Sequence, residues 1–342
     1  MGLDYRVRCC PDGLMTDRRR DVRVLDCTIR DGGCTNGWRF DLGLVRETVQ
    51  CLDQAGVDVI EIGYQTAEGV YDRGAVGVWR FSDEDALRQV TDGVSVKISC
   101  MIDMGRFSAS DLRPAEDSVV DVLRIATYGS DIREAVDLAH AAIDAGYEAH
   151  VNVMAVSTNT PQEVDAFLEV LRESRVSDVA VVDSFGALYP HHLRYLVRKY
   201  KNWLRPDQRV GVHLHNNQGV AFSNTIIAIE EGVDTADATI FGMGRGAGNC
   251  PLELLLMYLD DPTHDPRALF PLLERYAELR DEIRWGYHPA YAITGWLNRH
   301  PKDAIGHMRT DRPYDVTAFY DALVADRPHP RHHVPVREDG SF

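Results

Sequence analysis

Two histidines separated by one residue, His213 and His215, are the strongest candidates for chemistry in this sequence. Side chains alternate between the two faces of a strand, so both imidazoles would point to the same side and could bind a single cation. Asp31 follows an earlier apolar run and would add a carboxylate, which completes a site of two histidines and one carboxylate with positions left open for water and substrate. The alternative is that both histidines are core residues with ordinary hydrogen-bond partners. Their spacing favours the metal site.

Arg30 directly precedes Asp31, and Gly32 and Gly33 follow. Neighbouring residues of a strand point to opposite faces, so Arg30 and Asp31 can both serve one site only if the strand ends there, as the two glycines would allow. Arg30 would either bind a substrate carboxylate through two parallel hydrogen bonds and stabilise a developing enolate, or pair with Glu61 on the neighbouring strand. The two roles are compatible.

Eight short β-branched runs alternate with longer stretches in which apolar residues recur every three or four positions, and this alternation predicts an α/β fold, a (β/α)8 TIM barrel. A doubly wound open sheet is the competing fold, but it usually has fewer strands. In a closed barrel the first and seventh strands are separated by one strand only, and the active site lies at the carboxyl ends of the strands. The predicted strands are 22–31, 57–64, 94–102, 121–128, 149–156, 178–184, 209–216 and 235–242.

The rest of the chain divides around this barrel. We expect a polar leader at 1–21, the catalytic barrel at 22–262, a small helical C-terminal extension at 263–326 and a disordered tail at 327–342, where proline, histidine and charged residues show no periodicity. Thr160 before Pro161 is a typical helix start.

Composition narrows the classes of function. The 342 residues include 37 Lys+Arg and 53 Asp+Glu, a net charge of −16, and the one basic cluster (Arg18 to Arg20) is flanked by aspartates, so we expect no nucleic-acid partner. No run approaches the ~20 apolar residues of a membrane helix, and no signal peptide is recognisable. The seven cysteines lack CxxC spacing, which fits a reducing compartment. We therefore expect a cytoplasmic protein without a membrane partner.

A glycine-rich segment follows the eighth predicted strand and matches G-x-G-x-x-A at Gly242, Gly244 and Ala247. A dinucleotide fingerprint would follow the first strand of a βαβ unit, and no further strand comes after this one. We interpret the segment as a tight loop at the mouth of the barrel.

Four segments occur in an order that is familiar: DCTIRDG at 26–32, DS at 183–184, HLHNN at 213–217 and GMGRGAGN at 242–249. Together they resemble the metal-dependent aldolase, lyase and synthase superfamily of TIM barrels. This superfamily includes 4-hydroxy-2-oxovalerate aldolase, 3-hydroxy-3-methylglutaryl-CoA lyase and 2-isopropylmalate synthase. The resemblance covers roughly 22–260 and is closest to the 4-hydroxy-2-oxoacid aldolases.

The resemblance implies a divalent cation, Mn2+ or Mg2+, held by Asp31, His213 and His215, with Asn249 as a further ligand or a neighbour of the ligands. The cation would act as a Lewis acid on a 2-oxo acid. The arginine of the family matches Arg30, and Ser184 matches the residue that helps to seat the substrate carboxylate.

The acid/base group is where this sequence departs from those aldolases. Cys34 and Tyr64 stand where the aldolases have histidines, and Cys34 either shapes the pocket or is the acid/base itself. Tyr287 and Tyr291 lie beyond the barrel and are further candidates for the acid/base; their spacing by four predicts that they share one helical face. The resemblance implies that this segment lies over the mouth of the barrel. Packing of the extension is the alternative role for these two tyrosines. Tyr64 and a water molecule on the metal are the remaining candidates for the acid/base.

The predicted function is therefore that of a class II aldolase, a lyase that forms or cleaves the bond between a pyruvate-like 2-oxo acid enolate and an aldehyde. The alternative is a Claisen-type acyltransferase that condenses a 2-oxo acid with an acyl-CoA. Metal-dependent hydrolysis and a non-catalytic binding role fit the motifs less well. We expect small-molecule substrates and a homo-oligomer. The resemblance also implies an aldehyde dehydrogenase partner, although the C-terminal domain through which those aldolases pair with it is only loosely matched here.

Overall fold

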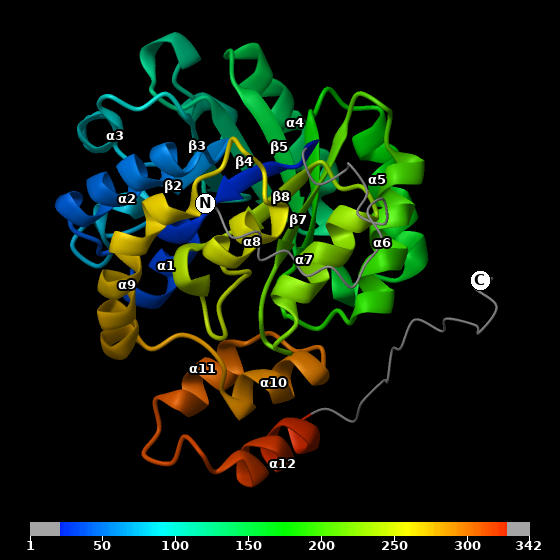
Figure 1. The fold of residues 1–342 in the computed structure, drawn as a ribbon. Helices are drawn as coiled ribbons and strands as arrows, with labels where there is room; N and C mark the ends of the chain where they lie inside the picture. The colour runs from blue at the N-terminus through cyan, green and yellow to red at the C-terminus, as the bar shows by residue number, and fades with distance from the viewer. Residues whose placement is uncertain (1–20, 327–342) are drawn as a thin grey trace, which may run out of the picture.

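Eight parallel strands close into a barrel in chain order in the computed structural model, which describes residues 21–326 (Figure 1). Each strand pairs with the next along the chain, and β1 pairs with β8. Every one of the eight predicted runs overlaps one of these strands, so the predicted (β/α)8 barrel is confirmed. The strands are β1 (Arg23–Asp26), β2 (Val59–Gln65), β3 (Lys97–Asp103), β4 (Val122–Thr127), β5 (Glu148–Val153), β6 (Asp178–Asp183), β7 (Arg209–Leu214) and β8 (Thr235–Ala238).

The first predicted strand is wrong at its carboxyl end. β1 stops at Asp26, and Thr28–Asn36 form a short helix, α1, in place of the predicted strand end and glycine turn. Gly32 and Gly33 lie inside this helix, where a Cβ atom would come within 2.7 Å of Met243 and 2.0 Å of Trp38. The two glycines therefore allow close packing around α1.

The barrel strands are covered on both faces, as is typical of parallel strands joined by helices. All six residues of β6, for example, are buried. The predicted helix start at Thr160 is confirmed, because its side chain accepts a hydrogen bond from the Glu163 amide in a capping box. The covering helices are α2 (Leu42–Ala55), α3 (Glu84–Thr91), α4 (Ile132–Asp144), α5 (Pro161–Arg172), α6 (Pro190–Trp203), α7 (Ala221–Glu230) and α8 (Leu252–Leu259), and short 3-10 helices include η2 (Val78–Arg80), η6 (Val156–Thr158), η7 (Ile240–Gly242) and η8 (Pro266–Leu269).

The predicted C-terminal helices are present, and the last three of them lie together at one end of the barrel (Figure 1). They are α9 (Phe270–Ile283), α10 (Pro289–Trp296), α11 (Lys302–Met308) and α12 (Val316–Asp326). The last three share a small apolar cluster with Ala247 from the glycine-rich loop. Loops that follow β5 and β6 also touch this segment, since Ser157 bonds Asn298 and Phe185 packs on His300. The segment 286–301 therefore lies over the carboxyl ends of the strands.

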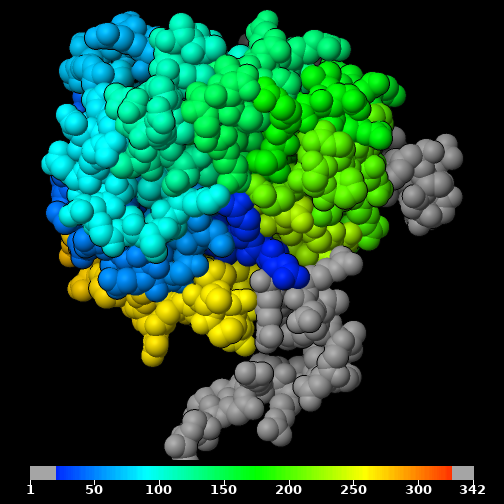
Figure 2. All heavy atoms as spheres, turned by 90° about the horizontal axis from the view of Figure 1, so that it is seen from above, coloured from blue at the N-terminus to red at the C-terminus, as the bar shows by residue number. Residues whose placement is uncertain are grey.

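Figure 2 shows the molecule from above, turned by 90° from the view of Figure 1, with the first described residues in sight. The dark-blue first residues lie at the surface there, between cyan and yellow-green segments, as expected for a strand that pairs with both β2 and β8 (Figure 2). Within 21–326, no helix is long and apolar enough to cross a membrane. The predicted disordered tail and the predicted polar leader, apart from its last residue, lie outside the described residues.

Candidate metal centre and active site

The structure brings the three predicted ligands, Asp31, His213 and His215, together at the carboxyl end of the barrel. One ligand atom from each residue lies within 4.8 Å of the other two, and all three residues are buried. His215 Nε2 lies 3.6 Å from Asp31 Oδ2. His213 lies on β7 and His215 directly follows it, so both imidazoles reach the same side of the strand.

Both histidines are held so that Nε2 carries the lone pair. His213 Nδ1 donates to Asp237 Oδ2 (2.9 Å) and His215 Nδ1 donates to the Asp183 carbonyl oxygen (3.1 Å). The two Nε2 atoms are buried and have no hydrogen-bond partner among the described residues. Burial lowers the pKa of His215 to about 3, so this ring is neutral at pH 7. Neutral imidazoles with a fixed Nδ1–H and a free Nε2 are typical metal ligands.

Asp31 is ionised despite its burial. Burial alone would raise its pKa, but the charge of Arg30 and the hydrogen bond from Asn249 hold the pKa well below the usual range. Asn249 Nδ2 donates to Asp31 Oδ2 (2.5 Å) and to the Met243 carbonyl oxygen (3.0 Å). Asn249 Oδ1 is buried without a partner in the described part of the chain. Asn249 therefore orients the carboxylate and leaves an amide oxygen free beside it.

The glycine-rich loop permits this close approach. A Cβ atom on Gly244 would lie 2.1 Å from Asn249 Nδ2 and 2.6 Å from Asp31 Oδ2. No side chain fits at this position without displacing one of the two polar groups. The absence of a side chain at Gly244 is thus a requirement of the candidate metal centre.

Arg30 reaches the site from α1, beside Asp31. Successive residues of a helix are about 100° apart, so both side chains can point into the barrel, which a strand would not have allowed. Arg30 Nε donates to Glu61 Oε2 (2.6 Å) and Nη1 donates to Asp31 Oδ1 (2.8 Å). Nη2 is buried and has no acceptor in the region that the structure describes. The predicted pairing with Glu61 is present, and one nitrogen remains available to a ligand.

A network of buried charged side chains extends from Arg30 into the barrel. Arg124 contacts Glu61 Oε2 through Nη1 (3.2 Å) and donates to Asp237 Oδ2 through Nη2 (2.5 Å). Burial raises the pKa of Asp237, but Arg124 and His213 outweigh it and bring the pKa down to about 2. Together with Asp31 and Arg30, this buried network contains three carboxylates (Asp31, Glu61 and Asp237) and two guanidinium groups (Arg30 and Arg124). One negative charge is in excess, which suits a bound cation.

Sequence reasoning missed Arg124 and Asp237. Each is a charged residue in an otherwise apolar or small-residue strand, β4 (VLRIAT) and β8 (TADA), and each is buried. A charge in a doubly covered strand needs a buried partner, so this pattern is the signal that would have found both residues.

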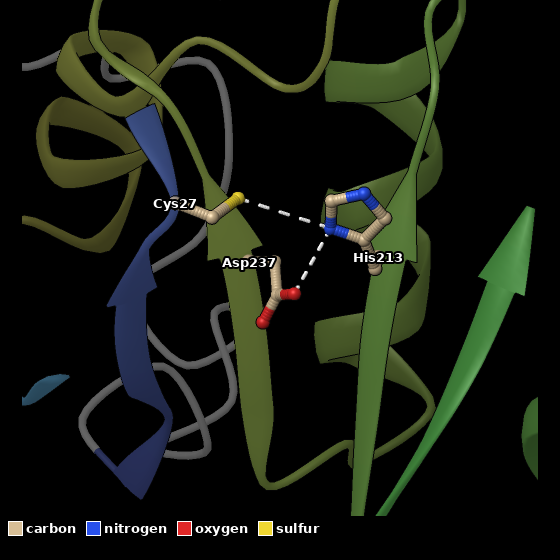
Figure 3. A group of neighbouring side chains, drawn as sticks. All are labelled: Cys27, His213 and Asp237. Carbon is tan, nitrogen blue, oxygen red and sulfur yellow. Dashed lines mark hydrogen bonds and ion pairs between the residues drawn. The ribbon is translucent and has the colours of Figure 1, made fainter. Parts of the chain in front are cut away.

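Cys27, His213 and Asp237 form a second cluster with metal-ligand side chains (Figure 3). Cys27 Sγ lies 3.9 Å from His213 Nδ1, the nitrogen that already donates to Asp237. Burial raises the pKa of Cys27 well above normal, so the group is a thiol. The lone pair of His213 is on Nε2, the other ring nitrogen. We therefore interpret Cys27 and Asp237 as residues that hold the candidate ligand His213 in place.

The remaining barrel candidates lie near the same mouth. Ser184 Oγ is buried and accepts from the Ala155 amide (2.8 Å), which leaves its own proton to donate. Burial raises the pKa of Cys34 to about 12, so it stays a thiol at neutral pH. Tyr64 is buried, its ring meets Trp38 edge to face, and burial together with Cys34 and Asp103 raises its pKa well above normal.

The prediction that Tyr287 and Tyr291 share one helical face is wrong, because α10 begins at Pro289 and leaves Tyr287 in the connecting segment. Tyr287 is 71% exposed. Tyr291 is buried, and its ring lies 3.2 Å from where a Cβ of Gly246 would be. Tyr291 therefore packs α10 on the glycine-rich loop.

Comparison with known proteins agrees with this site. The HMGL-like family model matches residues 21–270. A 4-hydroxy-2-oxovalerate aldolase of Rhodococcus jostii is 32% identical over 71% of this chain and 68% of its own length. An oxaloacetate decarboxylase of Mycobacterium tuberculosis is 31% identical over 83% of this chain and 82% of its own. The N-terminal domain of a protein described as an aldolase from Bacteroides vulgatus superposes with a TM-score of 0.78, at 28% identity, over 88% of this chain and all of that one. This chain belongs to the HMGL-like family, as its four sequence motifs indicated.

Proposed function

We propose that this protein is a divalent-metal-dependent lyase of the aldolase type, which makes or breaks the carbon–carbon bond between a 2-oxo acid enolate and an aldehyde. One observation carries the proposal: the two unpartnered Nε2 atoms of His213 and His215 face the ionised Asp31, beside the unpartnered Nη2 of Arg30. The names of the curated relatives add support, since 4-hydroxy-2-oxovalerate and oxaloacetate are both 2-oxo acids.

Asp31, His213 and His215 would hold Mn2+ or Mg2+, and the free amide oxygen of Asn249 lies next to them. Two imidazoles and one carboxylate leave coordination positions for a substrate. A bound divalent cation supplies Lewis-acid polarisation of the ketone and carboxylate oxygens of the 2-oxo acid.

The chain's own groups would orient the 2-oxo acid. Arg30 is fixed by Glu61 and Asp31, so its Nη2 donates to a substrate oxygen without losing further side-chain freedom. Glu61 then acts by positioning Arg30, and the Ser184 hydroxyl donates to the substrate carboxylate.

We propose Tyr64 as the residue that gives a proton to the aldehyde oxygen during condensation. Its pKa is raised by burial, so the phenol is protonated at pH 7 and can donate. Cys34 and Asp103 lie near the phenol, and Arg80 covers its ring at 4.0 Å from the centroid, which fixes the orientation of the ring.

Replacing Tyr64 with phenylalanine is expected to lower the rate of aldol condensation at least tenfold, because general acid catalysis typically contributes about 10²–10⁴-fold. Exchange of the pyruvate methyl protons with solvent should persist, since that step does not involve the aldehyde. Tyr287→Phe removes an exposed hydroxyl and should change neither rate. If Tyr287→Phe loses condensation while Tyr64→Phe stays active, the proton donor is Tyr287 in the C-terminal extension and not Tyr64.

The proposed function is tested by incubating the protein with Mn2+, pyruvate and a panel of aldehydes, with acetyl-CoA as the competing electrophile. We expect a 4-hydroxy-2-oxo acid product with an aldehyde, no release of free CoA, and loss of both condensation and proton exchange in EDTA. Release of CoA from acetyl-CoA would favour the acyltransferase alternative, and full activity in EDTA would exclude the metal-dependent reaction.

Decarboxylation of oxaloacetate is a second candidate reaction of the same site. Breaking the bond between C3 and the C4 carboxylate releases CO2 and leaves the enolate of pyruvate, and no group has to take a proton from a hydroxyl. Cys34, whose pKa is raised to about 12, stays protonated at neutral pH, and Tyr287 is exposed. Both observations favour a reaction that needs no base for a hydroxyl proton. Formation of pyruvate from oxaloacetate, faster than with Mn2+ alone, is the test. A homo-oligomer, an aldehyde dehydrogenase partner and a cytoplasmic location remain predictions.

A further inference from the structure

Arg245, in the glycine-rich loop, differs from the other arginines at the barrel mouth. Arg30 pairs with Glu61 and Asp31, and Arg80 pairs with Asp103. No carboxylate of the described residues forms an ion pair with Arg245. Its Nη2 donates to the Ser184 carbonyl oxygen (2.9 Å), and its Nε is buried without an acceptor among residues 21–326.

A buried guanidinium nitrogen without a partner is costly unless a ligand supplies the acceptor. A carboxylate is the acceptor that a guanidinium binds best, because two parallel hydrogen bonds can form. The residues on both sides of Arg245 are Gly244 and Gly246, which have no side chains that could screen it.

Arg245 lies between the candidate metal centre and the extension. A Cβ atom on Gly244 would lie 2.1 Å from Asn249 Nδ2, and one on Gly246 would lie 3.2 Å from the Tyr291 ring, so the loop around Arg245 touches both.

Burial is the main reason that the pKa of His300 lies below normal, at about 4, and the charge of Arg245 lowers it further. His300 packs against Phe185, the residue after Ser184, with ring centroids 5.5 Å apart. Its Nδ1 accepts from the Lys302 amide, so the proton of the neutral ring is on Nε2.

The other direction from the metal ligands is closed. Below Asp31 and His213 the barrel is filled by Arg30, Glu61, Arg124 and Asp237, all of them buried. The part of a substrate that is not held at the metal ligands must therefore extend toward the mouth, where Arg245 and His300 lie.

We propose that Arg245 determines substrate specificity by binding a carboxylate on the aldehyde fragment. The preferred substrate would then be a 4-hydroxy-2-oxo dicarboxylate, which splits into pyruvate and an aldehyde that itself bears a carboxylate, glyoxylate being the smallest. This inference rests on the proposed function. In cleavage the 4-hydroxyl loses its proton, the C3–C4 bond breaks, C4 becomes the aldehyde carbonyl, and the electron pair stays on C3 as the enolate, which takes up a proton to give pyruvate.

The competing role for Arg245 is structural, a tie between the glycine-rich loop and Ser184. The kinetic experiment separates the two by comparing condensation of pyruvate with glyoxylate and with acetaldehyde. In Arg245→Ala, kcat/KM for glyoxylate should fall at least tenfold more than kcat/KM for acetaldehyde, chiefly through KM. Arg245→Lys should restore part of the glyoxylate activity, and Arg267→Ala, which removes an exposed arginine on η8, should change neither.

Binding without turnover gives a second measurement. 2-Oxoglutarate and 2-oxovalerate have the same length and differ only in a terminal carboxylate against a methyl group. In the Mn2+-loaded protein, 2-oxoglutarate should raise Tm more than 2-oxovalerate does, and this difference should disappear in Arg245→Ala.

The outcomes distinguish this inference from the proposed function. If wild-type protein exchanges the methyl protons of pyruvate but Arg245→Ala keeps the wild-type ratio of glyoxylate to acetaldehyde activity, the assignment of Arg245 is overturned and the lyase stands. If wild-type protein with Mn2+ shows no exchange, the proposed function fails. An equal Tm shift by 2-oxoglutarate in wild type and Arg245→Ala would overturn the assignment of Arg245 by itself.

Discussion

Replacing His213 with alanine is expected to release bound Mn2+ and to reduce pyruvate proton exchange by more than 100-fold. The expectation follows because His213 clusters with Asp31 and His215, and its buried Nε2 has no hydrogen-bond partner in the described structure. Changing a group that only supports a ligand commonly costs about 10- to 100-fold in metal affinity or activity, so removing a ligand should cost more. Metal per chain after gel filtration and proton exchange by NMR are the measurements.

Two further variants compare the loss in His213→Ala with the loss of a supporting group and with a control histidine. Asp237→Asn keeps a hydrogen-bonding group beside His213 Nδ1 but removes the charge, so a loss of about 10- to 100-fold in affinity for Mn2+ is expected. His191→Ala removes an exposed histidine from the first turn of α6 and should leave metal content and exchange as in wild type. A His213→Ala protein that retains one Mn2+ per chain would show that the cation does not need this ligand.

The barrel was predictable because each buried strand carries a run of β-branched residues, and each run is followed by helical periodicity. The end of β1 was not predictable in this way. Thr28 and Ile29 continue the β-branched pattern locally, but they belong to α1, a helix held by Met243 and Trp38 packing on Gly32 and Gly33. These contacts are made by residues that follow the strand or lie far along the chain, and local sequence does not encode them.

The clustering of the two candidate metal ligands His213 and His215 was predictable from a local rule, since two residues spaced by two share one side of a strand. The buried charged residues that support these histidines were not predictable. Asp237 and Arg124 meet only because β4 and β8 contribute to the same closed barrel, and their partner Glu61 comes from β2. The tyrosine pair failed for a different reason: spacing by four implies one face only inside a helix, and α10 begins two residues after Tyr287.

Replacing Arg30 with lysine is expected to lower kcat for aldol condensation by on the order of 100-fold, although the charge is kept. Removing one donor that stabilises a developing oxyanion costs about 10²–10³-fold. The guanidinium serves Glu61 through Nε, Asp31 through Nη1 and a ligand through Nη2. Lysine has a single nitrogen and cannot reproduce this planar arrangement. Steady-state kinetics with pyruvate and an aldehyde, together with pyruvate proton exchange, measure the loss.

A loss of stability alone would not explain that result, and Arg124→Lys provides the comparison. Arg124 is equally buried and pairs with the same Glu61, but its other contact is Asp237, the carboxylate that holds His213 Nδ1. Arg124→Lys should therefore lower Tm about as much as Arg30→Lys and lower kcat much less. If Arg30→Lys turns over near the wild-type rate, Arg30 serves only to neutralise Glu61, and the unpartnered Nη2 does not act on the substrate.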